Sequence, residues 1–119
     1  QGIVCPVPND LSIMRRELEI KSIISREKPD GIFVSDDLTA ILVMKIARQL
    51  GLSIPDDLKI IGYDGTAFIR HFYPELATIQ QPLDEIAKLC VEILLKKIKG
   101  KTVNRDYVLP VNLIAGGSI

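Results

Sequence analysis

The alternation of short β-prone apolar runs with amphipathic helical segments most strongly limits the folds open to this 119-residue chain. Apolar residues recur at three- and four-residue steps between residues 10 and 28, and the apolar run 32–34 follows. A second helical pattern covers residues 38–50, and a second short run covers residues 58–61. This order is typical of an α/β fold, in which helices cover both faces of an open, mostly parallel sheet.

The remaining segments continue this pattern. We expect strands at residues 2–5 and 107–114, a short extended piece at 77–79, and a loop at 62–74. Pro110 favours a sheet edge for the last strand, and Pro82 suits the first turn of a further helix that Gly100 ends. The residues expected on the inner face of that helix are Leu83, Ile86, Ala87, Cys90, Ile93, Leu94 and Ile98.

Charge balance and cysteine usage restrict the classes of function. Fifteen Lys and Arg residues offset fifteen Asp and Glu residues, so the chain lacks the basic surface of a protein that grips DNA directly. No apolar run approaches the roughly 18 residues of a membrane span, which predicts a soluble chain. Cys5 and Cys90 match no metal-ligand or redox spacing, which favours a reduced, cytoplasmic setting over the alternative of one disulfide. Because the chain begins at Gln1 rather than Met and enters an expected strand at Gly2, we expect it to be part of a longer protein.

Two acidic residues stand directly after short apolar runs. Asp36 follows residues 31–35, and Asp64 follows residues 58–63. The carboxyl ends of parallel strands meet at the edge where open α/β sheets bind their ligands. A carboxylate can accept two hydrogen bonds at once, which suits adjacent hydroxyl groups on a sugar ring. The pair therefore predicts a site for a small molecule rich in hydroxyl groups.

Each aspartate also has a purely structural interpretation. Asp36 or Asp37 can cap the helix that begins near Leu38, because an Asp before a helix accepts hydrogen bonds from unpaired backbone N–H groups. Asp64 precedes Gly65 in a segment typical of a turn. The pattern alone leaves the structural and ligand-binding interpretations open for both residues.

Catalysis has little support in the sequence. His71 is the only histidine, and neither a Ser-His-Asp set nor an HExxH motif can be assembled around it. No phosphate-binding glycine motif is present. We expect no enzyme, no cofactor and no metal site, and we expect His71 to be a loop histidine, with ligand binding or pH sensing as its alternative. The enzymatic alternative is an acid/base pair formed by Asp36 and Asp64.

Three apolar residues allow either a core or an interface position. Ile41 and Met44 lie on the apolar face of the helical pattern 38–50, and Phe72 lies in the expected loop. We expect Met44 to pack in the core, whereas both positions are open for Phe72. An exposed apolar strip at these residues would indicate a partner surface.

Four motifs give the chain a resemblance to a known family: VSDDLTA at residues 34–40, GLSIPDDL at 51–58, IGYDGT at 61–66 and LATIQQP at 76–82. In this order and at these spacings they resemble the effector-binding region of LacI/GalR-family transcriptional regulators, and within it the ribose- and sucrose-operon type. The resemblance implies a periplasmic-binding-protein-like (type I) fold of two lobes. Residues 1–119 would be mainly the C-terminal lobe, without the DNA-binding domain and most of the N-terminal lobe.

The resemblance also implies roles for individual residues. Asp36 falls at the mouth of the family's effector cleft, Asp64 on its ligand-contacting aspartate, and Gln81 on a polar position that lines the pocket. Leu11 falls where some members stack an aromatic ring on the sugar, and Gly116 where many carry Arg. Both are departures from the family pattern, and Leu11 puts a stacked sugar in doubt because leucine has no π-face.

Partners follow from the same resemblance. We expect a sugar or sugar phosphate effector, operator DNA bound only through an N-terminal domain, and a homodimer whose contact region includes Ile41, Met44 and Phe72. The expected setting is the cytoplasm, with no membrane partner. The alternative of another class is a periplasmic-type sugar-binding protein for transport, which shares the fold.

Overall fold

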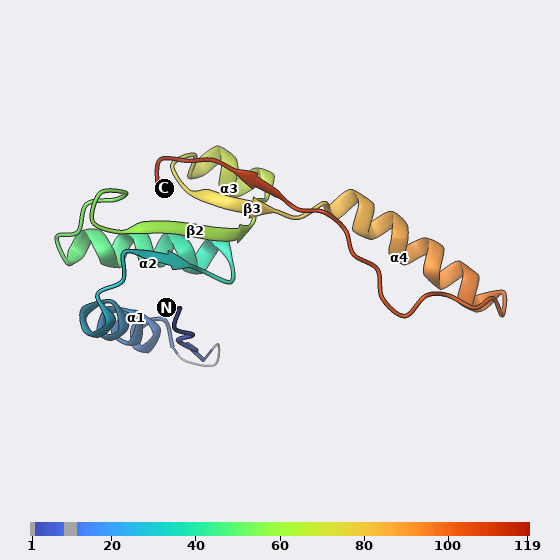
Figure 1. Cartoon of the computed structure of the whole chain (residues 1–119), viewed down its shortest axis with the longest axis horizontal. Coiled ribbons are helices and arrows are strands. Elements are labelled where there is room, and N and C mark those ends of the chain that lie inside the picture. The colour runs from blue at the N-terminus through green and yellow to red at the C-terminus, as the bar shows by residue number, and fades with distance from the viewer. Residues whose placement is uncertain (1, 9–11) are drawn as a thin grey trace.

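A computed structural model describes residues 2–8 and 12–119 of the chain (Figure 1). Helices and strands alternate along the chain, as the sequence predicts. In chain order they are α1 (Ile13–Glu27), β1 (Gly31–Phe33), α2 (Asp37–Gln49), β2 (Lys59–Asp64), α3 (Ala67–Phe72), β3 (Ala77–Gln80), α4 (Leu83–Ile98) and β4 (Asn112–Ile114).

One four-stranded sheet, in the order β1-β2-β3-β4, forms the centre of the fold. β1, β2 and β3 are parallel, and β4 runs antiparallel to β3 at the edge. The predicted α/β class with a mostly parallel sheet is therefore confirmed. β4 is shorter than the expected strand at 107–114, because β3 ends at Gln80, which pairs with Asn112 and leaves residues 107–111 no strand to pair with.

Helix ends agree with the capping residues in the sequence. The hydroxyl of Ser12 accepts a hydrogen bond from the backbone N–H of Arg15 at the start of α1. Asp36 caps α2, and Gly51 follows its end with φ +79°, a left-handed conformation that glycine adopts without steric strain. These local signals set where α1 begins and where α2 begins and ends.

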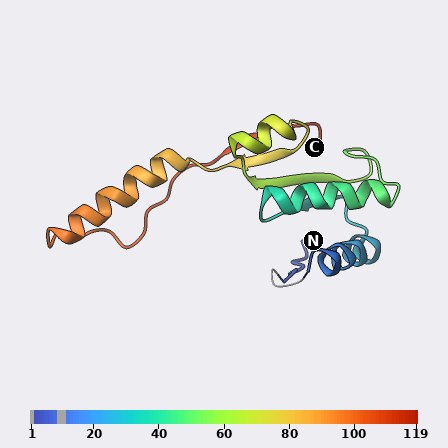
Figure 2. The same ribbon diagram turned by 180° about the vertical axis from the view of Figure 1, so that it is seen from behind.

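The hydrophobic core lies between α2 and the sheet, with α1 packed against α2. Its largest buried apolar side chains include Ile46 of α2 and Ile60 of β2, and Ile20 and Ile24 of α1 complete it. α2 and α3 lie behind the sheet in Figure 1 and in front of it in Figure 2, so they share one face. The sequence predicts helices on both faces. Both crossovers step in the same direction across the sheet, and right-handed crossovers in one direction place their helices on one face.

Two further expectations on secondary structure are wrong. The expected strand at residues 2–5 does not form, because a strand needs a neighbour for its backbone hydrogen bonds and none of the described strands pairs with these residues. The expected loop at 62–74 contains α3, which Thr66 caps through a 3.4 Å hydrogen bond from the N–H of Ile69. A six-residue helix is too short to show a helical period in the sequence.

α4 projects away from the sheet, and residues 99–111 run back from its far end to β4 (Figures 1 and 2). None of the residues of α4 is buried, and of the predicted inner face only Ile86 and Ile93 are half-buried, so most of that face is exposed in the described part of the chain. The radius of gyration is 17.8 Å, against about 13–14 Å for a compact domain of this length. No described helix is both long and apolar enough to cross a membrane.

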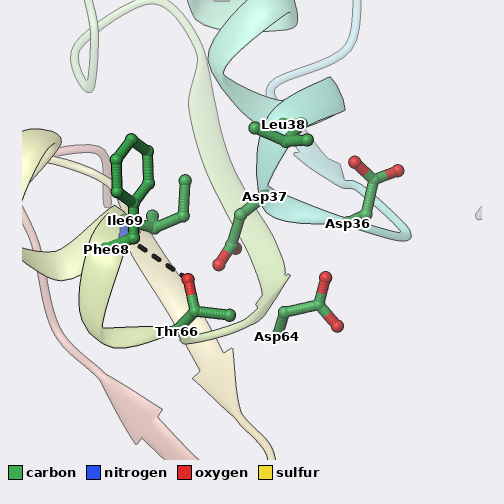
Figure 3. Close-up of a pocket in the computed structure, with 7 residues that line it drawn as sticks. All are labelled: Asp36, Asp37, Leu38, Asp64, Thr66, Phe68 and Ile69. Atoms are coloured by element: carbon green, nitrogen blue, oxygen red, sulfur yellow. Dashed lines mark hydrogen bonds between the residues drawn. The ribbon is translucent and has the colours of Figure 1, made fainter.

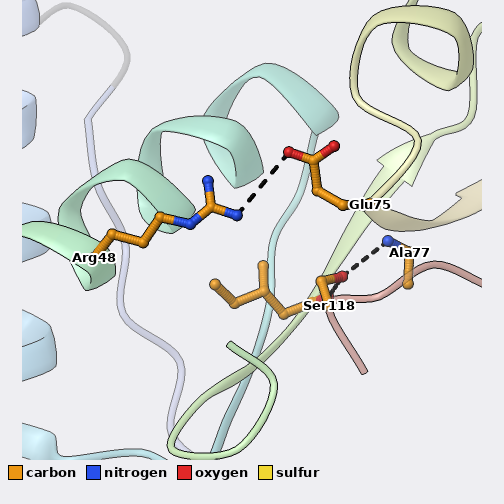
Figure 4. A network of polar contacts seen from close by, with 5 residues as sticks. Arg48, Glu75, Ala77 and Ser118 are labelled. Carbon is orange, nitrogen blue, oxygen red and sulfur yellow. Dashed lines mark hydrogen bonds and ion pairs between the residues drawn. The ribbon is translucent and has the colours of Figure 1, made fainter. Parts of the chain in front are cut away.

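Ser118, near the C-terminus, forms hydrogen bonds to residues at the start of β2 and β3. The Ser118 hydroxyl accepts a 2.8 Å hydrogen bond from the N–H of Ala77 and donates one of 2.6 Å to the carbonyl of Ile60 (Figure 4). Its own carbonyl accepts from the N–H of Ile60 at 2.8 Å. Arg48 on α2 and Glu75 form an ion pair nearby, at 4.0 Å. Ser118 is fully buried, so it stabilises the start of β2 and β3 from inside the fold.

Candidate functional site

The candidate site lies at the carboxyl ends of β1 and β2, where the sequence places Asp36 and Asp64. β1 pairs with β2 in parallel, so both strands end at the same edge of the sheet. Asp36 lies in the turn from β1 into α2, and Asp64 is the last residue of β2. Both residues line one pocket of about 410 Å³ (Figure 3). That volume is within the range of small-molecule sites.

Asp36 caps α2 and still faces the pocket. Its Oδ1 accepts a 2.8 Å hydrogen bond from the backbone N–H of Thr39, which fixes the side chain at the helix start. Its Oδ2 accepts a weaker 3.4 Å bond from the Ser35 hydroxyl. The structural and ligand-binding interpretations are therefore compatible, because capping occupies one carboxylate oxygen and leaves most of the other available.

Asp64 is held in an unusual backbone conformation by Gln81. Its φ is +127°, a region that residues other than glycine rarely adopt. The side-chain amide of Gln81 donates a 2.8 Å hydrogen bond to Asp64 Oδ1, and the backbone N–H of Gln81 donates one of 3.2 Å to the Asp64 carbonyl. The structure thus brings together the predicted residues Asp64 and Gln81.

The pocket combines acceptors with an apolar wall. Besides the two aspartates, it is lined by Asp37, Leu38, Thr66, Phe68 and Ile69. Leu38 is 71% exposed and Phe68 is 60% exposed, so their apolar surface is available for contact. In Figure 3 the carboxylates of Asp36 and Asp64 lie together on one side, and Phe68 stands on the opposite side. A second hollow of about 500 Å³ also contains Asp36 and Leu38, between α1 and α2. Carboxylates opposite apolar carbon match a molecule with hydroxyl groups and a C–H face.

Asp37 also lines the pocket, although the sequence indicated it only as a possible helix cap. It is 2% exposed, and both its carboxylate oxygens accept hydrogen bonds, from the N–H of Gly65 at 2.9 Å and from the hydroxyl of Thr78. Two adjacent aspartates at a strand end allow one to cap and the other to turn inward, and the sequence does not say which. The structure assigns the cap to Asp36.

The remaining predicted residues separate into three groups. Leu11 lies outside the described residues. Met44 is 2% exposed and belongs to the core cluster between α2 and the sheet, so its expected core position is confirmed, and its place in the dimer contact region stays a prediction. Ile41 is half-buried, and Phe72 is 60% exposed. The Phe72 ring lies 4.6 Å from that of Phe68, measured between ring centroids.

No metal-binding group and no disulfide is found among the described residues. No cluster of three or more His, Cys, Asp or Glu residues there has a geometry that could hold a metal ion. Cys5 and Cys90 are both free thiols. His71 is exposed on α3, where its ring meets that of Phe72 edge to face at a centroid distance of 5.0 Å.

Comparison with known proteins decides the family. Residues 5–119 match the periplasmic binding protein-like domain family. The chain belongs to that family. A sucrose operon repressor of Streptococcus mutans serotype c is 56% identical to it over 119 residues, covering 100% of this chain and 37% of the relative. A sucrose operon repressor of Pediococcus pentosaceus is 46% identical over 112 residues, covering 92% of this chain and 34% of the relative.

A solved structure of the same fold agrees with this assignment. It is a periplasmic binding protein/LacI transcriptional regulator from Alkaliphilus metalliredigens complexed with D-xylulofuranose, with a TM-score of 0.67 and 38% sequence identity. The match covers 84% of this chain and 37% of that one. Together these matches confirm the resemblance to LacI-family effector-binding domains. The chain spans about a third of the length of the curated relatives it matches.

Proposed function

We propose that this chain is the C-terminal lobe of the effector-binding domain of a LacI-family repressor that responds to sucrose or its phosphate. The observation that carries the proposal is the pairing of Asp36 and Asp64 on one side of a single pocket, at the carboxyl edge of a parallel sheet. The 56% identity to a sucrose operon repressor supports the choice of sugar. Because the relatives with high identity are repressors, transport is the less favoured alternative.

The two carboxylates act as hydrogen-bond acceptors for the sugar. Asp64 Oδ1 is already bonded to Gln81, so its Oδ2 is directed to the ligand, while Asp36 offers the oxygen that Ser35 contacts only at 3.4 Å. Hydrogen bonds to an ionised acceptor are stronger than neutral ones. A sugar bound here would be held through two or more hydroxyl groups, with its C–H face toward Leu38 and Phe68.

Control of transcription follows from a difference in affinity. An effector shifts a protein between two conformations only to the extent that it binds one of them more tightly. In our proposal a second lobe closes over the sugar, and the changed lobe arrangement releases operator DNA bound by an N-terminal domain. The repressor acts in the cytoplasm as a homodimer, with Ile41 and Phe72 in the contact region.

Release of operator DNA by sugars tests the proposal. Fluorescence anisotropy of labelled operator with the full-length protein is measured against sucrose, sucrose 6-phosphate and ribose, with mannitol as the control polyol. We expect sucrose or its phosphate to lower operator affinity at least about tenfold, a shift of the size typical of allosteric coupling. Unchanged affinity with both sucrose and sucrose 6-phosphate would contradict the proposal, whatever the effect of ribose.

A further inference from the structure

The buried carboxylate of Asp37 is not needed as a helix cap. Asp36 already accepts the capping hydrogen bond at the start of α2. Asp37 is 2% exposed, and a charged group removed from water is unfavourable unless hydrogen bonds compensate its lost hydration. A buried carboxylate at this position therefore needs another explanation. The explanation is that it forms hydrogen bonds to two separate segments of the chain.

Asp37 joins the turn after β2 to the strand β3. One oxygen accepts from the N–H of Gly65 at 2.9 Å, and the other accepts from the hydroxyl of Thr78. Thr78 is fully buried and pairs in register with Gly62 on the neighbouring strand. A Cβ atom at Gly62 would stand 2.4 Å from Asp37 Oδ1, so the glycine leaves the space that the carboxylate occupies.

The Gly65 contact acts on the residue next to Asp64. Asp64 has φ +127°, and such conformations persist only where surrounding contacts determine them. On one side the backbone and side-chain N–H groups of Gln81 hold Asp64. On the other side Asp37 holds the peptide N–H that directly follows Asp64.

We propose that Asp37 is a positioning residue for effector binding, which fixes Asp64 in its strained conformation through the N–H of Gly65. Although Asp37 lines the pocket, both of its carboxylate oxygens are bonded within the protein, so neither is offered to the sugar. This inference rests on the proposed function of Asp64 as an effector contact. Without Asp37, the turn at Gly65 relaxes toward an unstrained backbone, and the Asp64 carboxylate leaves the orientation in which it faces the sugar hydroxyls.

The test is a comparison of sugar affinity in the full-length protein by isothermal titration calorimetry. The probe is sucrose, or sucrose 6-phosphate where only the phosphorylated sugar releases the operator. We expect Asp37→Ala to raise the Kd about tenfold, as loss of a hydrogen bond to a charged group would. Thr78→Val removes the other hydrogen bond of the same carboxylate and leaves the Gly65 contact. It is expected to lower Tm as Asp37→Ala does, but to change Kd less than about twofold.

A double-mutant cycle distinguishes positioning from a general loss of stability. In an Asp64→Ala background, Asp37→Ala is expected to leave Kd unchanged, because its effect passes through the Asp64 carboxylate. If Asp37→Ala does not fold, the double variant Asp37→Leu with Thr78→Val is used instead. It replaces both side chains of the buried Asp37–Thr78 hydrogen bond by apolar ones of similar shape, and it is compared with Thr78→Val alone. A Kd for either Asp37 variant equal to that of its reference would overturn the inference, and so would additive effects in the cycle. A wild-type protein that binds neither sugar would overturn the proposed function as well.

Discussion

The side-chain amide of Gln81 donates a 2.8 Å hydrogen bond to Oδ1 of Asp64, across the gap between the end of β3 and the end of β2. This contact connects two residues that lie 17 positions apart in the sequence. It leaves one oxygen of Asp64 for a ligand and fixes the direction in which that oxygen points.

Gln81→Leu should therefore weaken effector binding although Gln81 itself does not line the pocket. We expect a rise in Kd of about three- to tenfold, because Asp64 loses the amide that orients it. The matched control is Gln49→Leu on the exposed end of α2. Calorimetric titration of the full-length variants measures both values, and an equal Kd in the two variants would contradict this role.

Asp36 should show its two roles separately in two substitutions. Asp36→Ala removes the cap of α2 and should lower stability by about 0.5–2 kcal/mol, while Asp36→Asn keeps an equally good cap. Urea denaturation measures the stability, and sugar titration measures the loss of the charged acceptor. We expect Asp36→Asn to retain wild-type stability and to bind the sugar more weakly. Wild-type sugar affinity in Asp36→Asn would show that Asp36 acts only as a helix cap.

Met44 and Phe72 should respond in opposite ways to truncation. Met44→Ala leaves a cavity in the core and should destabilise the chain by about 2–5 kcal/mol. Phe72→Ala removes an exposed ring, so it should change folding stability little and raise the dimer dissociation constant at least about tenfold. Analytical ultracentrifugation of the full-length protein measures the second effect. An unchanged dimer in Phe72→Ala would place the interface elsewhere.

Gly65→Ala should be much more harmful than Gly51→Ala. Both glycines have positive φ, +62° and +79°. A Cβ at Gly51 meets nothing within 4 Å, whereas one at Gly65 would lie 2.5 Å from the Cα of Gln80. We expect Gly65→Ala to lose about 1–3 kcal/mol more than Gly51→Ala, as overpacking does. Urea denaturation of the two variants in parallel gives the difference, and equal losses would show that the contact with Gln80 is easily relieved.

Ser118→Ala should destabilise the fold although the change is small. It leaves the N–H of the buried Ala77 without its hydrogen-bond acceptor, a loss of about 1–3 kcal/mol. The control is Ser53→Ala, at an exposed serine before β2, which should stay near wild-type stability. A similar denaturation midpoint for the two variants would show that the C-terminal contact contributes little.

The sequence predicts local features of this fold better than long-range ones. The capping role open to Asp36, the stop at Gly51 and the strand-end positions of Asp36 and Asp64 each depend on a few neighbouring residues, and the structure bears them out. The inward turn of Asp37 depends on Thr78, 41 residues away, and no local pattern indicates it.

The predictions for α4 and for residues 2–5 are wrong for a related reason. The apolar period of α4 is real, but periodicity identifies an apolar face and not the surface that covers it. Residues 2–5 are β-prone, but a strand forms only where a neighbouring strand is available. In both cases the missing information concerns packing partners rather than the segment itself.

Sugar binding by an Asp64→Ala variant tests the central claim most directly. Asp56→Ala, at an exposed aspartate in the turn before β2, is the matched control because it removes a carboxylate outside the pocket. We predict that Asp64→Ala raises the Kd for sucrose or sucrose 6-phosphate more than about tenfold and leaves operator affinity without sugar unchanged, while Asp56→Ala binds like wild type. Wild-type sugar affinity in Asp64→Ala would contradict the account.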